Sequence, residues 1–194
     1  MFGPVVSRRV SVILVGMAAV GAGCGGSSSA TPPRTTVAPR SPIVTAHIAR
    51  PVSATPSKSA QMVCSAEAQQ QILADATGVR TTRPVVATWK DDVYSCPYVY
   101  GTHVMVLSVK ELANKADTDD YFASLMQQLG VSRTVPIGPR AFVARNGSVV
   151  VQKDYKVLFV DVGKLPQQFG EPLDTRESIA LNVATTIIGC WSGE

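Results

Sequence analysis

Apolar residues are distributed differently along three parts of the chain. They predominate over Val10–Val20, are sparse and without a period over residues 25–59, and recur at helical and strand spacings over residues 61–194. Periodic apolar positions mark segments that bury one face in a core. The pattern therefore predicts one folded domain of 134 residues at 61–194, a size sufficient for a single hydrophobic core.

Three segments of this domain have apolar residues at helical spacing. The predicted helices are Ser65–Thr77, Thr118–Leu129 and Thr175–Ile188, and a glycine follows each of them. Acidic groups open the second and third helices; they are Asp117, Asp119, Asp120, Asp174 and Glu177. Such carboxylates are candidates for metal or acid–base chemistry, but helix capping and the helix dipole explain them more simply, and we favour capping.

Hairpins are predicted between the helices. Val93–Tyr100 and Thr102–Lys110 turn near Gly101. Ala141–Arg145 and Ser148–Lys153 flank Asn146-Gly147, the strongest short hairpin signal in the chain, and a further strand follows at Lys156–Val162. The order α-β-β-α-β-β-β-α predicts an α+β fold: a mostly antiparallel sheet of four to five strands with the helices packed on one face.

The formal charge of +4 belongs to the residues that precede the domain. Residues 61–194 carry 12 Lys or Arg and 14 Asp or Glu, whereas residues 1–60 carry six cations and no acid. A domain with this balance lacks the electrostatic footprint of a nucleic-acid-binding protein. We therefore expect no nucleic-acid partner.

Residues 1–23 have the layout of an export signal. Arg8 and Arg9 precede the 11-residue apolar run Val10–Val20, which is shorter than the ~20 residues that a membrane-spanning helix needs. The run leads to Gly21-Ala22-Gly23-Cys24, which resembles the lipobox of bacterial lipoproteins, where the cysteine receives a diacylglyceryl group and becomes the new N-terminus.

Two cleavage sites stay open at this point of the chain. Gly21 departs from the Leu or Val that is usual three residues before the lipobox cysteine, and ordinary signal-peptidase cleavage after Ala22 is the alternative. If Cys24 is lipidated, acyl chains attach the protein to the extracytoplasmic face of the cell membrane. Residues 24–60, with six prolines and many Ser, Thr, Gly and Ala residues, then form a disordered tether between lipid and domain.

The cysteine count depends on the fate of Cys24. With Cys24 lipidated, Cys64, Cys96 and Cys190 remain, and an exported protein is expected to form a disulfide. A Cys64–Cys96 bridge joins the first helix to the first strand, and we favour it over pairings that use Cys190, which is then a buried free thiol. With Cys24 unmodified, two bridges are possible.

This layout is similar to that of small actinobacterial lipoproteins of unknown function, of the mycobacterial Lpr and Lpp types. The resemblance lies in the lipobox, the tether, the segment Cys64-Ser65-Ala66-Glu67 and the strand motif Cys96-Pro97-Tyr98, in which Pro97 departs from the pattern. It implies an envelope location and a role in binding a solute or partner.

No sequence motif for catalysis or metal binding occurs in the domain. His103 is the one histidine after residue 60, so a histidine-dependent site would have to use it. We expect no catalytic residue, no metal and no cofactor. Tyr94, Tyr98 and Tyr100 alternate along one strand, so they either line a ligand-binding face together with His103 or pack in the core, which we favour.

The sequence favours a membrane-anchored, non-catalytic binding module for a cell-envelope component or partner protein. A hydrolase or transferase that acts on cell-wall material is the alternative, and a lipid carrier with an apolar cavity between sheet and helices is a further one.

Overall fold

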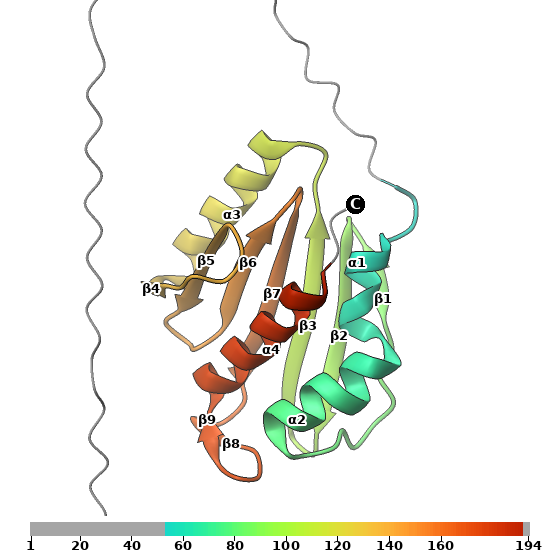
Figure 1. The fold of residues 1–194 in the computed structure, drawn as a ribbon, viewed down its shortest axis with the longest axis vertical. Coiled ribbons are helices and arrows are strands. Elements are labelled where there is room, and N and C mark those ends of the chain that lie inside the picture. Colours follow the sequence, from blue (N-terminus) through green and yellow to red (C-terminus); the bar gives the residue numbers. More distant parts are fainter. Residues whose placement is uncertain (1–52, 192–194) are drawn as a thin grey trace, which may run out of the picture. The chain divides into compact units, whose positions relative to one another are not determined.

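The computed structural model describes residues 53–191. The predicted signal peptide, Cys24 and most of the predicted tether lie outside these residues. The described chain forms one large antiparallel sheet, in the order β1-β2-β3-β7-β6-β5-β4 (Figure 1). Its strands are β1 (Thr88–Lys90), β2 (Val93–Tyr100), β3 (His103–Glu111), β4 (Val131–Thr134), β5 (Arg140–Ala144), β6 (Val149–Lys153) and β7 (Lys156–Lys164).

Helices of several kinds connect and cover the strands. They are α1 (Lys58–Gln61), the 3-10 turn η1 (Met62–Cys64), the π-helical segment η2 (Ala68–Ile72), α2 (Leu73–Thr77), α3 (Lys115–Leu129) and α4 (Arg176–Cys190). A two-stranded ribbon of β8 (Gln168–Phe169) and β9 (Asp174–Thr175) precedes α4.

The large sheet consists of a three-stranded meander, β1–β2–β3, and a four-stranded meander, β4–β5–β6–β7, which meet where β3 pairs with β7. Tight turns hold each meander together. Asp91 and Asp92 between β1 and β2 both have positive φ, at 50° and 58°, as a type I′ hairpin turn requires. Gly147, at φ 86°, lies in the turn between β5 and β6 that the Asn-Gly pair predicted.

Side chains alternate between the two faces of the sheet, and helices cover both. In β6, Val149 and Val151 belong to the core beneath α2 and α4, whereas Val150 packs in a second core beneath α3. The second core is centred on Phe122 of α3 and Phe142 of β5, whose ring centroids lie 5.3 Å apart in an edge-to-face arrangement. All of these side chains are buried.

The prediction of four to five strands with helices on one face is wrong. The sheet has seven strands, and α3 lies on the face opposite to α4. Continuous apolar runs such as Val149–Val151 place apolar side chains on both faces, so both faces need cover. Strands β1 and β4, with three and four residues, are too short to show a period in the sequence.

Helix starts also differ from the prediction. Helix α1 lies in the range that composition assigned to the tether, and its Ser59 and Ala60 are buried, so the fold begins before residue 61. The predicted helix Ser65–Thr77 is a π-helical segment followed by a short α-helix. Asn114 and Thr175, and no aspartate, accept the capping hydrogen bonds at the starts of α3 and α4.

Candidate binding cleft

A cleft of about 810 Å³ lies at the end of the sheet where β3 ends and β6 turns into β7. Figure 1 shows that this turn, α1 and the start of α3 lie at the same end of the sheet. The cleft is lined by four stretches of chain: part of residues 53–61, part of 111–119, 139–140 and 152–156. Cleft-lining residues come from both faces, because Arg140 and Gln152 lie on the α3 face and Glu111 and Lys156 on the α4 face.

Asp119 is the centre of a hydrogen-bond network on the α3 side of the cleft. Its Oδ1 accepts from Gln152 Nε2 at 2.8 Å and from Arg140 NH1 at 3.0 Å, and its Oδ2 accepts from Lys115 Nζ. These donors hold the pKa of Asp119 below its ordinary value, with the hydrogen bond from Gln152 as the largest cause and that from Lys115 next. Asp119 therefore stays ionised and positions the cationic groups around it.

The guanidinium group of Arg140 is held in place from two sides. Its central carbon lies 4.6 Å from the centroid of the Phe122 ring, and NH1 donates to both Asp119 Oδ1 and Gln152 Oε1. Within residues 53–191, its Nε and NH2 groups have no hydrogen-bond partner. About half of the side chain is exposed. Arg140 thus presents oriented, unused donors to solvent.

Glu111 closes the α4 side of the cleft. Its Oε1 accepts hydrogen bonds from both the backbone N–H and the hydroxyl of Ser57, the residue that caps α1. Lys156 lies opposite Glu111 in the register of β3 with β7, and both side chains are buried. The Lys156 ammonium group is 6.0 Å from the centroid of the Trp191 ring. A buried carboxylate and a buried cation thus face each other at the sheet end.

Lys153 links the cleft to the end of α4. Its ammonium group donates to the carbonyl oxygen of Trp191 at 2.6 Å and to that of Ile188 at 3.4 Å. A cation at the C-terminus of a helix satisfies free carbonyl groups and interacts favourably with the helix dipole. Lys153 therefore stabilises α4 while part of its side chain lines the cleft.

Positive charge is concentrated at the cleft. Three carboxylates and five cations line it, the cations being Lys58, Lys115, Arg140, Lys153 and Lys156. The rest of residues 53–191 has eight cations and ten carboxylates. Lys58 makes no ion pair or hydrogen bond through its ammonium group with other described residues. The cleft is therefore electropositive on a domain that is otherwise slightly acidic.

The aromatic row predicted as a possible ligand-binding face lies in the core. Tyr98 and Tyr100 are 0% and 5% exposed beneath the helices, and Tyr94 packs against the same core. The favoured interpretation, core packing, therefore agrees with the structure for Tyr98 and Tyr100, and their burial leaves the ligand-stacking alternative without support. Burial raises the pKa of Tyr100 to about 12, and burial together with the neighbouring Tyr100 and Tyr94 raises the pKa of Tyr98 well above its ordinary value.

His103 lies far from the cleft. It starts β3, and its ring packs edge-on against Phe169 with 6.1 Å between centroids. Glu111, at the cleft, ends the same strand eight residues later, so roughly 26 Å separate the two ends at the usual rise of a strand. Among residues 53–191, no group of three or more His, Cys, Asp or Glu side chains is placed to hold a metal ion.

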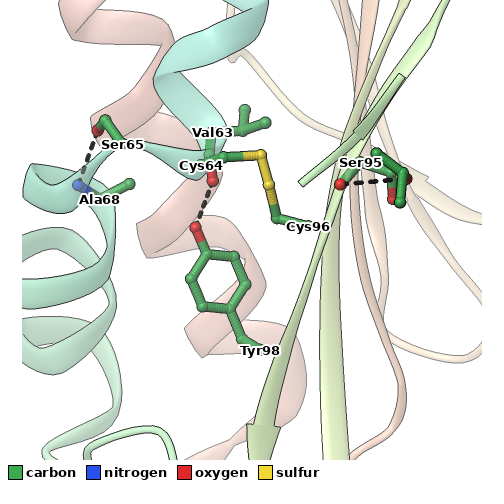
Figure 2. Close-up of a disulfide and its surroundings, with 8 residues drawn as sticks. Val63, Cys64, Ser65, Ala68, Ser95, Cys96 and Tyr98 are labelled. Atoms are coloured by element: carbon green, nitrogen blue, oxygen red, sulfur yellow. Dashed lines mark hydrogen bonds between the residues drawn. A yellow bond between two sulfur atoms is a disulfide. The ribbon is translucent and has the colours of Figure 1, made fainter. Parts of the chain in front are cut away.

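The structure pairs Cys64 with Cys96 in a disulfide, with 5.7 Å between their Cα atoms. Figure 2 shows that the bridge joins the segment before η2 to β2. Cys190 is free, as favoured in the sequence, but it is exposed, because it ends α4 at the surface. It lines a shallower cleft between η2, α2 and α4 together with residues that include Glu67, Asp75 and Asn182.

The cleft could not be predicted from local sequence patterns. Its main side chains come from segments far apart in the chain, such as Ser57, Glu111 and Gln152, and no spacing connects them. The sequence held a partial signal: Gln152 directly follows the apolar run Val149–Val151, and a polar side chain that is buried beside such a run needs a hydrogen-bond partner. That partner is Asp119, for which the sequence favours a role at the helix start over metal or acid–base chemistry.

Comparisons of the chain with models of known protein families, with curated proteins and with solved structures found no match. No helix within residues 53–191 is both long and apolar enough to span a bilayer.

Fully buried side chains, among them Leu158, Ile179 and Val183, fill the layer between the sheet and α4. This packed layer gives the lipid-carrier alternative no support.

Proposed function

We propose that this chain is an exported lipoprotein whose folded domain binds a component of the cell envelope in the cleft at the sheet end. The cleft carries the proposal: it is large enough for a small ligand, and hydrogen bonds to Asp119 and Glu111 hold Arg140 and Ser57 in place at its wall. A rigid sheet and two helices support these groups, as a pre-organised binding site requires.

Binding fits the cleft better than catalysis does. The carboxylates of Asp119 and Glu111 are each engaged by donors of the protein, and the lowered pKa of Asp119 makes it a poor general base near neutral pH. His103 is at the opposite end of β3. The side chains at the cleft therefore favour holding a ligand over transferring its protons.

The chain before the domain supports an envelope location. Arg8, Arg9 and the run Val10–Val20 have the layout of an export signal, and Cys24 follows the small residues of a lipobox. Ser53, the first described residue, lines the cleft, so the segment that would lead to Cys24 enters the domain beside it. A membrane-anchored domain would then carry its cleft at the end where the tether attaches.

The anchoring part of the proposal is tested by producing the full chain in a bacterium that processes lipoproteins. The mass of the mature protein should correspond to an N-terminus at Cys24 carrying a diacylglyceryl group, and the protein should fractionate with membranes. Cys24→Ala should lose both properties. A mature N-terminus at Gly23, after cleavage behind Ala22, would contradict lipid anchoring.

The binding part is tested with a variant that fills the cleft. Thr55 lines the cleft and is exposed, so Thr55→Trp should obstruct it without disturbing the core. Val86→Trp, at a residue that is 67% exposed and outside the cleft, is the matched control. Mass spectrometry of molecules that co-purify with each protein from its own envelope should show ligands lost only in Thr55→Trp. Recovery of the same co-purifying molecules with both variants would contradict the proposed binding function.

A further inference from the structure

We infer that the cleft binds a phosphate-bearing anion through Lys58, Lys115 and Arg140, the chemistry shared by an acidic phospholipid headgroup and a soluble phosphate ester. This inference rests on the proposed function and adds the chemical class of the ligand. It is carried by three independent features of the described residues: the charge at the cleft, the unused donors of Arg140, and the position of Asp119.

The first feature is the surplus of cations. Around Asp119, one carboxylate serves two cations, Lys115 and Arg140. Lys58 adds a third cation, whose ammonium group has no partner within the described chain. Lys115 is 77% exposed and Arg140 47% exposed, so both reach solvent at the cleft. A negatively charged ligand would balance the positive charge of these three cations that the single carboxylate of Asp119 does not neutralise.

The second feature is the orientation of Arg140. Contact with the Phe122 ring and the hydrogen bonds of NH1 fix the plane of the guanidinium group, while Nε and NH2 remain without a partner in residues 53–191. A fixed guanidinium group recognises phosphate oxygens with two parallel donors. The ammonium groups of Lys58 and Lys115 supply further positive charge to the remaining phosphate oxygens.

The third feature is that Asp119 occupies the place of an internal anion. Its Oδ1 and Oδ2 already accept from Arg140 and Lys115, the same groups that an external phosphate would engage. Asp119 accepts from NH1 of Arg140, whereas a phosphate would accept from Nε and NH2, so the two anions compete for the charge of the same cations and not for the same N–H groups. This competition gives the inference a prediction that a purely structural role of the network does not make: removing the charge of Asp119 should strengthen binding.

The experiment uses the full chain purified with its lipid in a neutral detergent, titrated with inorganic phosphate and with glycerol 3-phosphate by calorimetry. Lys58→Gln and Arg140→Lys should each weaken binding by about tenfold, the loss expected for one charge-assisted hydrogen bond. Asp119→Asn should strengthen it. Lys90→Gln and Lys164→Gln, at exposed cations outside the cleft, should leave it unchanged.

A second measurement separates the two sources of phosphate. The lipidated protein is reconstituted in vesicles of phosphatidylcholine with or without phosphatidylglycerol, and hydrogen exchange is followed for the amides of residues 152–156. Protection that requires phosphatidylglycerol and is lost in Lys58→Gln assigns a headgroup ligand. Binding of glycerol 3-phosphate without such protection assigns a soluble phosphate ester. Thermal melting of each variant shows whether it is folded.

The inference is overturned if neither phosphate compound binds and phosphatidylglycerol gives no protection, or if Asp119→Asn and Lys58→Gln bind like the wild type. These results differ from a failure of the proposed function. An uncharged envelope ligand that Thr55→Trp displaces would overturn the phosphate inference and leave the binding function standing. Unchanged recovery of every ligand in Thr55→Trp would remove the binding function itself.

Discussion

The hydroxyl group of Tyr98 donates a hydrogen bond to the backbone carbonyl oxygen of Val63, one residue before the disulfide-bonded Cys64 (Figure 2). Both residues are fully buried. The disulfide and this hydrogen bond thus both join η1 to β2. This junction fixes the layer of η1, η2 and α2 on the sheet and makes the stability of the domain sensitive to single atoms.

Removal of the Tyr98 hydroxyl group in Tyr98→Phe should destabilise the domain by about 1–3 kcal/mol, because the buried carbonyl group of Val63 is left without its donor. Urea unfolding followed by circular dichroism measures the change in the free energy of unfolding. Tyr155→Phe, at a side chain that is 47% exposed, should unfold like the wild type. Equal midpoints for Tyr98→Phe and Tyr155→Phe would contradict the role of this hydrogen bond.

Loss of the disulfide in the double variant Cys64→Ser/Cys96→Ser should lower the free energy of unfolding by roughly 3–4 kcal/mol, the chain-entropy value for a loop of this length. The same loss should appear when the wild type unfolds in the presence of a reductant. Cys190→Ser is the control, because Cys190 is free and exposed. A wild type whose stability is unaffected by a reductant, or that unfolds like the double variant, would contradict the Cys64–Cys96 bridge.

The buried tyrosines should make the fold sensitive to alkali. Because the pKa of Tyr100 is about 12 in the folded state and near 10 in an unfolded chain, the folded state keeps the proton that the unfolded state releases. The contribution of the Tyr100 proton to the free energy of unfolding is therefore fully present below about pH 10, and it is lost as the pH rises toward about 12. Absorbance at the phenolate band should show late titration, and Tyr100→Phe should reduce the loss of stability. Unfolding that is independent of pH in this range would refute the assignment.

A methyl group at Gly78 should be strongly destabilising. Gly78 ends α2 with φ +65°, and a Cβ there would lie 1.7 Å from the carbonyl oxygen of Glu171. Gly78→Ala should cost at least about 2 kcal/mol, because the backbone of one segment must move and the left-handed conformation is strained. Gly189→Ala is the matched control: beyond its chain neighbours and the backbone of its own helix, a Cβ there would meet no atom within 4 Å, and alanine in helix α4 should stabilise by about 0.5–1 kcal/mol. Thermal melting of both variants measures the change in stability. A Gly78→Ala protein as stable as the wild type would contradict the close packing of Gly78 against the backbone of Glu171.

Local sequence patterns anticipated much of the secondary structure. The hairpin at Asn146-Gly147 and the boundaries of β2 agree with the structure, because the turn residues and apolar alternation act within a few positions. The pair Asp91-Asp92 was a usable but overlooked signal for β1, since aspartate tolerates the positive φ of a hairpin turn. The helix α3 on the second face of the sheet was not predicted, although the continuous apolar run Val149–Val151 indicates that both faces of this strand are buried.

The binding cleft shows the limit of local patterns more clearly. Asp119 reads in sequence as one of several acids at a helix start, and only the approach of β5 and β6 gives it Arg140 and Gln152 as partners. The same holds for Glu111, whose donor Ser57 comes from 54 residues earlier in the chain. Contacts at such separations depend on how helices and strands pack, which no short motif encodes.

Taken by itself, the sequence predicted the folded domain, the hairpin at Asn146-Gly147 and helical segments near those of the structure; the export layout ending at Cys24 stays a prediction, because it lies outside residues 53–191. These features depend on local composition, period and turn chemistry. Only the tertiary structure decided that α3 and α4 cover opposite faces, that Tyr98 and Tyr100 belong to the core, and that Lys115, Asp119 and Arg140 meet at one cleft. Strands that are apolar on both faces must be covered on both faces, and buried polar groups must find hydrogen-bond partners. Both requirements are met here by segments that are distant in the chain.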